Sequence, residues 1–313
     1  MSVILEGRRV LITGATGFVG SAVAKALMAE GSKVIALVRS RARAAELVPG
    51  ACAEVGDMLE PQTYRHLVDE VDAVVHTAQV RASGRVSAGT VRKMKLANHV
   101  MTTTLADSCK AAGKRFVYTG GCFVYGDHGS SWINESTPLA PSPLGEADAA
   151  ELTRLRALHH QGLDVVTLSP GFVYGPGGNF KTGFYNQGRK NQLRCIGAGD
   201  NYWSCVHVDD LAAAYAAALA HAAPGDEYNI VDDSPLSLSS FVDQVAAMMG
   251  GKRKGDLPRW AAALALGGPA IASLTTSYRV DNSKAQDRLG WAPICSTVAE
   301  GLPPTLTVLE RGT

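Results

Sequence analysis

The sequence predicts an α/β fold in which a doubly wound parallel sheet is followed by a smaller C-terminal α/β lobe that binds substrate. Three observations support this. Short apolar runs alternate with helical patterns over the first half of the chain, a glycine-rich turn joins the first run to the first helix, and glycine-rich loops dominate beyond Pro170. Apolar strands separated by helices are typical of a parallel sheet that is covered on both faces. We therefore place a nucleotide-binding domain in residues 1–170 and a substrate lobe in residues 171–313, with some elements of the lobe returning to the main sheet.

The elements of the first domain follow from apolar runs and helical periodicity. Strands are predicted at "RRVLITG" (8–14), "KVIALVR" (33–39), "ACAEVGD" (51–57), "DAVVHTA" (72–78), "KRFVYTG" (114–120) and "LDVVTLS" (163–169), and helices at 18–30, 63–69, 91–112 and 146–161. In the second half, "DEYNIVD" is a candidate strand of the main sheet. The apolar stretch from Trp260 to Leu274 is interrupted by glycines and a proline and is too short to span a bilayer, so we expect a buried or lid-forming helical segment.

The charge balance and the spacing of the cysteines limit the kinds of molecule and ion that the protein is expected to bind. The 313 residues include 30 Lys and Arg against 29 Asp and Glu, and this balance argues against nucleic acid or a membrane surface as a partner. A small-molecule substrate is expected. The six cysteines form no CxxC pair and no Cys/His cluster with zinc-ligand spacing, so we expect no metal site. Reduced thiols, and an N-terminus that enters the first strand without a signal-peptide pattern, predict a cytoplasmic location.

The stretch "VLITGATGFVG" places Gly14, Gly17 and Gly20 between the first strand and the first helix. Glycines at this turn allow the backbone to approach a pyrophosphate, and the helix N-terminus directs unpaired amides at the phosphates. A glycine triplet can also be a simple turn, but its place in a strand–turn–helix–strand unit indicates a Rossmann dinucleotide site. The cofactor-binding residues predicted around it are Gly14, Thr16, Gly17, Phe18, Val19, Arg39, Asp57, Met58, Thr77, Ala78, Asp148 and Pro170.

Arg39 ends the second strand, where an NAD site usually has an acidic residue that binds the ribose hydroxyls. A carboxylate there would repel a 2′-phosphate, whereas arginine would bind it. The sequence therefore favours NADP over NAD, although Arg39 could also belong to a solvated basic turn. Asp57 and Met58 follow the third strand and fit a polar contact and an apolar wall for adenine, or ordinary loop positions.

Eight motifs occur in family order, namely "TGATGFVG", "GDM", "VVHTA", "LAN" (96–98), "FVYG" (123–126), "PGFVYGPGG", "CVHVDDLA" and "NSKAQDRLGW". On these residues the whole chain resembles the extended short-chain dehydrogenase/reductases, a group that includes sugar-nucleotide epimerases and dehydratases, dihydroflavonol reductases and 3β-hydroxysteroid dehydrogenases. The resemblance implies a Rossmann domain, a C-terminal substrate lobe and a homodimer built on two long helices. It also implies a serine or threonine, a tyrosine and a lysine that together handle one proton.

The catalytic set of the family is missing from the aligned positions. The serine position, three residues before the "VYG" triplet, holds Gly121, and the tyrosine and lysine positions hold Leu144 and Asp148. No tyrosine in the chain is followed four residues later by lysine. Leucine cannot exchange a proton, whereas Asp148 remains able to accept hydrogen bonds from ribose hydroxyls.

Four other side chains are candidate proton donors near these positions: Thr119, Cys122, Tyr125 and Tyr174. The alternative is that Cys122 is a buried small apolar residue and that the two tyrosines pack the loops. His76 is interpreted as a hydrogen-bonded histidine that supports its loop, and Asp209 or Asp210 as a helix N-cap that joins the two lobes.

Aromatic residues are expected on the loops that border the cleft, and they suit a ring-bearing or apolar substrate. The substrate contacts predicted are Phe123, Phe172, Tyr185 and Trp203. Several of these could instead fill the core between the lobes.

Three hypotheses remain open from the sequence. The first is an NADP-binding enzyme of atypical extended type that acts on an apolar carbonyl or alcohol compound of secondary metabolism, with a displaced proton donor or with water. The second is a non-redox isomerase, dehydratase or cyclase that keeps the nucleotide as structure. The third is a binding protein that senses NADPH. An apparent nucleotide site together with an aromatic cleft favours an enzyme.

Overall fold

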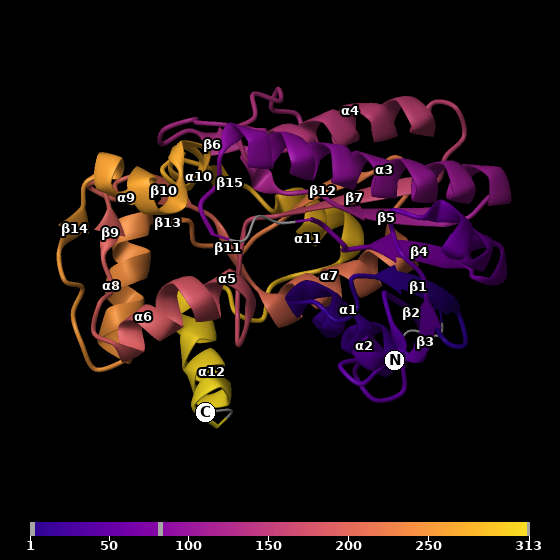
Figure 1. The fold of residues 1–313 in the computed structure, drawn as a ribbon, viewed down its shortest axis with the longest axis horizontal. Coiled ribbons are helices and arrows are strands. Elements are labelled where there is room, and N and C mark those ends of the chain that lie inside the picture. The colour runs from indigo at the N-terminus through magenta and orange to yellow at the C-terminus, as the bar shows by residue number, and fades with distance from the viewer. Residues whose placement is uncertain (1–3, 81–83, 312–313) are drawn as a thin grey trace.

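A seven-stranded, all-parallel sheet is the centre of the computed structural model, which describes residues 4–80 and 84–311. Its strands lie in the order β3–β2–β1–β4–β5–β7–β12 (Figure 1). They are β1 (Arg9–Thr13), β2 (Lys33–Val38), β3 (Cys52–Val55), β4 (Ala73–His76), β5 (Arg115–Thr119), β7 (Val165–Pro170) and β12 (Glu227–Ile230). The doubly wound sheet predicted from the alternating apolar runs is confirmed, and β12 pairs with β7 at its edge.

Helices cover both faces of this sheet (Figure 1). One face carries α1 (Phe18–Ala29), α7 (Val208–His221) and α11 (Ser283–Leu289), and the other carries η2 (Arg65–Glu70), α3 (Ala88–Ala112) and α4 (Glu146–His159). Short α2 (Arg41–Ala44) follows β2, and η1 (Pro61–Thr63) follows β3. Side chains of β1 alternate between the two layers, because Val10 and Ile12 pack toward α1 and α7 while Leu11 packs toward α3.

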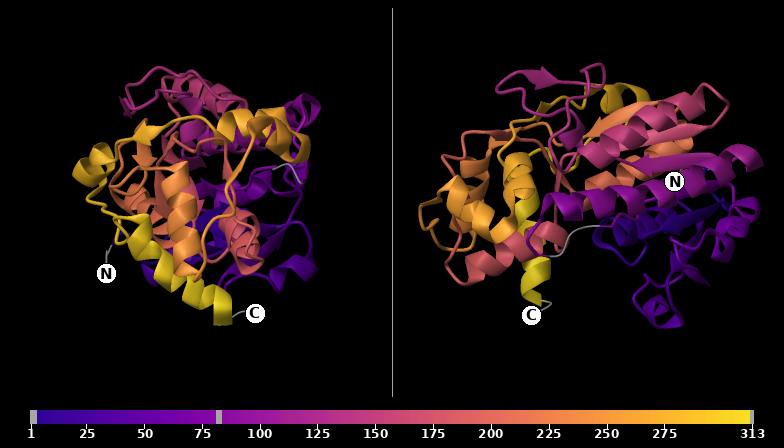
Figure 2. Two further views of the ribbon diagram at one scale, coloured as in Figure 1. Left: turned by 90° about the vertical axis from the view of Figure 1, so that its left-hand side faces the viewer. Right: turned by 45° about the horizontal axis from the view of Figure 1, so that its top comes forward.

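The smaller lobe surrounds a third core and contains four two-stranded pairings (Figure 2). Its strands are β6 (Trp132–Ile133), β8 (Phe172–Tyr174), β9 (Cys195–Ile196), β10 (Tyr202–Trp203), β11 (Cys205–His207), β13 (Leu236–Ser237), β14 (Asp256–Leu257) and β15 (Arg279–Val280). Its helices are η3 (Cys122–Val124), α5 (Gly178–Phe180), the π-helix η4 (Lys181–Tyr185), α6 (Asn186–Arg189), α8 (Leu238–Met248), α9 (Arg259–Leu266), α10 (Gly268–Leu274) and α12 (Val298–Arg311).

The apolar stretch from Trp260 to Leu274 forms two helices that are separated at Gly267. This glycine has φ +92°, and a Cβ there would lie 2.9 Å from the backbone nitrogen of Val86, so both conformation and space require glycine. The expected helical segment is confirmed; of the two alternatives, buried or lid-forming, burial does not hold for its first half, because α9 buries only Ala262, and the lid stays a prediction. Among the described residues, no helix combines the length and apolarity needed to cross a membrane.

Candidate active site

The glycine-rich turn lies where β1 and β4 diverge, at the point where strand order reverses. Gly14 has φ +78°, and a Cβ there would come within 2.8 Å of the backbone nitrogen of Ala78 and 2.9 Å of Thr77 Oγ1. The Thr77 hydroxyl in turn donates to the carbonyl of Thr13 at 2.7 Å. The residues that follow β1 and β4 therefore approach each other closely at the turn.

Gly17 is the N-cap of α1, and no side chain caps this helix. The first amides of α1 therefore have the arrangement that binds a pyrophosphate. The Phe18 ring packs against the loop after β8, because a Cβ on Gly175 would lie 3.1 Å from ring atom Cζ. Val19 is the second residue of α1, and Pro170 ends β7.

Basic side chains gather at the end of β2. Arg39 is exposed there, and Arg43 in α2 donates to Thr16 Oγ1 at 3.1 Å and pairs with Glu46 at 3.2 Å. The sequence reasoning did not single out Arg43, since its approach to the glycine turn depends on how α2 folds back. An uncapped helix N-terminus, a glycine turn without space for side chains and flanking arginines together fit a dinucleotide.

Asp57 and Met58 follow β3. The Asp57 carboxylate accepts from the amide of Leu59 at 2.9 Å, and Met58 is buried in the core beneath α3. Met58 therefore forms part of that core, whereas Asp57 shapes the loop beside it.

Two of the three positions aligned with the catalytic set, Gly121 and Asp148, lie next to each other. Asp148 stands in the first turn of α4, and a Cβ on Gly121 would be 3.5 Å from its Oδ2. The Tyr118 hydroxyl donates to Asp148 Oδ1 at 3.1 Å, and Gln79 Nε2 donates to the same oxygen at 3.5 Å. Half-buried Leu144 donates its amide to Ser273 Oγ at 3.0 Å. The carboxylate of Asp148 therefore occupies the space beside the position of the absent serine.

Tyr118 is a site residue that sequence reasoning missed, because a tyrosine in an apolar strand has the pattern of a core residue. Its side chain is almost completely buried beneath α4. Burial raises the pKa of Tyr118 well above its usual range, and the negative charges of Asp148 and Glu151 raise it further. The phenol therefore remains a hydrogen-bond donor to Asp148 across the physiological pH range.

The four candidate proton donors are all buried and hydrogen-bonded within the protein. Thr119 Oγ1 donates to the carbonyl of His76 at 2.8 Å, and Cys122 Sγ donates to that of Ser169 at 3.3 Å. Tyr125 donates to Asn229 at 2.9 Å, and Tyr174 donates to the carbonyl of Thr297 at 3.4 Å. Burial raises the pKa of Cys122, of Tyr125 and of Tyr174.

The predicted substrate contacts lie in or against the core of the lobe. Trp203 and Tyr185 are buried, and the Trp203 indole donates to the carbonyl of Leu274 at 3.1 Å. Phe172 is half-buried and packs on Trp203 with ring centroids 4.8 Å apart. Phe123 is half-buried and meets Tyr278 edge to face at 5.3 Å. Phe123 and Phe172 thus keep an accessible surface, whereas Trp203 and Tyr185 support them from within.

His76 is a hydrogen-bonded structural residue, as expected. Its Nδ1 lies 2.7 Å from Thr13 Oγ1 and its Nε2 lies 3.2 Å from Thr102 Oγ1. Burial lowers the pKa of His76 to about 3, so the ring is neutral. Its partners link β1, β4 and α3 beneath the glycine turn.

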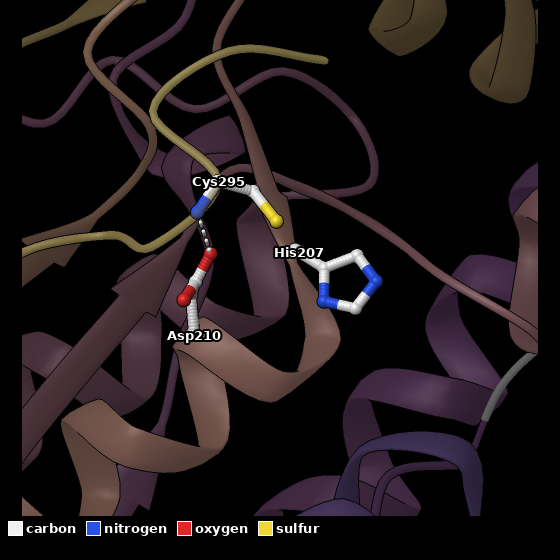
Figure 3. A group of neighbouring side chains, drawn as sticks. All are labelled: His207, Asp210 and Cys295. Atoms are coloured by element: carbon white, nitrogen blue, oxygen red, sulfur yellow. Dashed lines mark hydrogen bonds between the residues drawn. The ribbon is translucent and has the colours of Figure 1, made fainter. Parts of the chain in front are cut away.

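His207, Asp210 and Cys295 form a cluster whose polar atoms lie within 4.8 Å of one another (Figure 3). Asp210 accepts from the amides of Ile294 at 2.9 Å and Cys295 at 3.0 Å, and burial raises the pKa of Cys295 to about 11. The expectation that Asp209 or Asp210 caps α7 was wrong. The N-cap is His207, whose Nδ1 accepts from the Asp209 amide at 3.3 Å, so Asp210 is free to anchor the segment before α12.

Comparison with known proteins supports the assignment of a dinucleotide-binding fold. The model of the NAD dependent epimerase/dehydratase family matches residues 10–231. The chain is 30% identical to a 3-diazoavenalumate denitrifying reductase from a Streptomyces species, over 94% of this chain and 99% of that one. It is 28% identical to a 2-alkyl-3-oxoalkanoate reductase from Stenotrophomonas maltophilia, over 78% of this chain and 77% of that one. The crystal structure of a dTDP-glucose 4,6-dehydratase from Streptomyces venezuelae, with NAD bound, superimposes with a TM-score of 0.81 at 25% identity, covering 97% of each chain. The chain therefore belongs to the NAD dependent epimerase/dehydratase family and is an enzyme of its oxidoreductase and epimerase group.

Proposed function

We propose that this enzyme is an NADP(H)-dependent reductase of an apolar or ring-bearing small molecule, and that it works without the family's tyrosine. The observation that carries the proposal is the contrast between the two halves of the site. The nucleotide cradle, by which we mean the glycine turn and the N-terminus of α1 around Gly14 and Gly17, is complete. In contrast, Leu144 occupies the position of the family's proton donor.

The cradle residues have distinct tasks in this proposal. The amides at the start of α1 bind the pyrophosphate, and Arg39 and Arg43 bind the 2′-phosphate of the adenosine ribose. Asp148 accepts hydrogen bonds from the nicotinamide ribose, and Tyr118 and Gln79 fix its carboxylate. A bound nicotinamide nucleotide would supply the hydride.

The proton for a carbonyl substrate has no strong source among the four candidates. Thr119, Cys122, Tyr125 and Tyr174 are buried, and each already donates to another acceptor. We infer that these residues are structural and that water or the substrate itself provides the proton. Losing a positioned general acid typically costs about 10² to 10⁴ in rate, so carbonyl reduction here should be slow.

A second candidate substrate avoids that cost altogether. The Streptomyces relative, 30% identical over 94% of this chain, is named as a denitrifying reductase of a diazo compound. When a hydride replaces the diazonium group on a carbon, the carbon–nitrogen bond breaks and N₂ leaves with its electron pair. No proton is needed, so leucine at position 144 is compatible with full activity. Half-buried Phe123 and Phe172 suit an aromatic ring of this kind.

The cofactor assignment is tested by thermal unfolding with NADPH and with NADH. Arg39→Ala and Arg43→Ala should each weaken NADPH binding roughly tenfold, the typical loss of one hydrogen bond to a charged group. NADH protection should stay unchanged, and Lys25→Ala, on the exposed side of α1, should alter neither nucleotide. Equal protection by NADH and NADPH in the wild type would contradict the assignment.

The catalytic assignment is tested by restoring the family's set. Gly121→Ser, Leu144→Tyr and Asp148→Lys combined should create ketone reductase activity measured by NADPH absorbance. A folded, NADPH-binding but inert triple variant would contradict the alignment.

The wild type should reduce an arenediazonium ion faster than a ketone. If product forms from a ring-bearing substrate with no change in NADPH absorbance, the non-redox isomerase, dehydratase or cyclase alternative is supported.

Two features of the whole protein belong to this proposal. Leu96 and Val100 lie one turn apart on α3 and are both exposed, which supports a homodimer through α3 and α4. Leu96→Glu should then give a monomer in analytical ultracentrifugation.

All six cysteines are free, and we propose a cytoplasmic location on that basis.

A further inference from the structure

Helix α9 presents large apolar side chains to solvent. Trp260 and Leu264 lie one turn apart with exposed fractions of 72% and 67%, and Leu266 is 40% exposed. Only Ala262 of this helix is buried. Single exposed apolar residues are common on protein surfaces, but Trp260 and Leu264 share one face of this eight-residue helix and together form a patch of the kind that marks an interaction surface.

Cations flank this patch. Lys252 and Lys254 are exposed on the segment that leads into α9, and Arg259 is exposed at its first position. Arg253 between them is paired with Asp243 and Asp256, each at 3.1 Å, so the carboxylates nearby are already engaged. Positive charge is therefore concentrated here in a chain whose net charge is only +1.

The patch and the cations share one end of the molecule. The chain leaves α8, passes through β14 and enters α9 at the end of the substrate lobe farthest from the main sheet (Figure 1). The side chain of Arg259 lies beside Gly197, directly after β9, because a Cβ on Gly197 would be 3.2 Å from Arg259 Nε. The lysines precede β14, and Trp260 follows it after Pro258 and Arg259.

We propose that this α9 face, formed by Trp260 and Leu264 with Lys252, Lys254 and Arg259, docks on the surface of an anionic lipid bilayer. Trp and Leu side chains insert at the level of the headgroups, while lysine and arginine contact the lipid phosphates. Lysines are depleted from protein–protein interfaces, whereas tryptophan beside lysine and arginine is typical of a membrane-surface helix. The helix lies on the bilayer and does not cross it.

Hydrogen bonds link α9 and α10 to the loop before α3 and to position 144. The carbonyl of Leu266 accepts from the amide of Val86 at 2.8 Å, and Ser273 in α10 accepts from the amide of Leu144 at 3.0 Å. Helix α10 thus joins α9, the proposed bilayer contact, to position 144. A substrate dissolved in the bilayer would reach the site past these helices. This route rests on the proposed function, whereas the docking itself does not.

The test is flotation of the full-length protein with vesicles of phosphatidylcholine alone or with 30% phosphatidylglycerol. We expect binding to the anionic vesicles and at least tenfold weaker binding to the neutral ones. Raising the salt from about 0.1 M to 0.5 M should weaken binding strongly, since each cation contributes roughly fivefold near an anionic surface. Brominated lipids should quench Trp260, and Trp260→Phe should remove that quenching.

Paired variants separate the two contributions. Trp260→Ser with Leu264→Ser, and Lys252→Gln with Lys254→Gln, should each reduce binding to the anionic vesicles about tenfold or more. Ile294→Ser, which removes another exposed apolar residue, and Lys25→Gln with Lys33→Gln, which removes two other exposed cations, should bind like the wild type. Circular dichroism confirms that every variant is folded, and protection by NADPH is recorded separately.

Two results would overturn the proposal. One is a wild-type protein that fails to float with anionic vesicles at low salt. The other is a dimer that dissociates in the Trp260→Ser, Leu264→Ser variant while vesicle binding is unaffected, which would assign the α9 face to a second copy of the chain. A loss of nucleotide binding in all variants would concern the proposed function and leave the docking result unchanged.

Discussion

Asp232 is a buried carboxyl group outside the nucleotide cradle, at the end of β12. Its Oδ1 accepts from the amide of Ser234 at 3.2 Å, while its Oδ2 is buried without a hydrogen-bond partner. Burial raises the pKa of Asp232 to about 8, and the charges of Asp233, Asp210 and Glu300 act in the same direction. The folded protein therefore holds a proton on this group at neutral pH.

Because the folded pKa lies above that of the unfolded chain, Asp232 stabilises the fold fully only at low pH. Its contribution falls as the pH rises from about 4 to about 8 and is constant above that range. Asp232→Asn mimics the protonated group, so the variant should gain about 1 kcal/mol at pH 8, or roughly 2 °C in Tm, and little at pH 4.5. Thermal unfolding across pH measures this. The exposed Asp69→Asn variant should show no such trend, and a gain that is equal at both pH values would contradict the assignment.

Some residues of the site could be predicted from the sequence, and others could not. Gly14 and Asp148 could be placed because each lies at a fixed distance from a motif. Arg43 could not, since its hydrogen bond to Thr16 depends on how α2 folds over the glycine turn. Tyr118 could not either, because nothing in an apolar strand shows that one hydroxyl reaches a carboxylate 30 residues later. Contacts between distant segments decide such roles, and local patterns do not record them.

The glycine turn between β1 and α1 is the element on which the nucleotide site depends. Gly14→Ala would combine an unfavourable positive φ with a Cβ 2.8 Å from the backbone nitrogen of Ala78. The main chain would have to shift, so we expect a loss of about 2–3 kcal/mol in unfolding free energy and no protection by NADPH. Urea unfolding with and without nucleotide measures both effects.

Gly113, at the end of α3, is the matched control. It also has a positive φ, +63°, but a Cβ there meets nothing within 4 Å. Gly113→Ala should therefore cost only about 1 kcal/mol and retain NADPH protection. If both substitutions lowered the unfolding free energy equally, the close approach of Gly14 to the residues after β4 would not be the reason that the turn requires glycine.

Strands and helices of the main sheet could be predicted because apolar runs of fixed length recur between turn residues. The segment after Pro258 shows the limit of that reasoning. Trp260 and Leu264 have the spacing of a buried helix face, yet both are exposed. Periodicity defines which residues share a face, but what covers that face depends on the rest of the molecule or on a partner.

The two halves of the molecule are interleaved along the chain. After the lobe strands β8 to β11, α7 and β12 return to the main sheet, and the chain then enters the lobe again. Asp210 in α7 holds the segment before α12 through two backbone amides. Unfolding of the lobe alone would strain both connections, so we expect the halves to unfold together.

Two buried tryptophans can report on this expectation separately. Trp291 packs in the core beside α1 and α7, whereas Trp203 packs in the core of the lobe. Trp203→Phe and Trp291→Phe each leave one buried reporter in one half. In each variant, the urea midpoint from tryptophan emission should equal the midpoint from far-UV circular dichroism, as in an all-or-none transition. Since either substitution can shift stability, the comparison is made within a variant. A lobe that melts first would place the Trp203 midpoint below that of circular dichroism and the Trp291 midpoint above it, and this outcome would mean that β12 and Asp210 do not couple the halves.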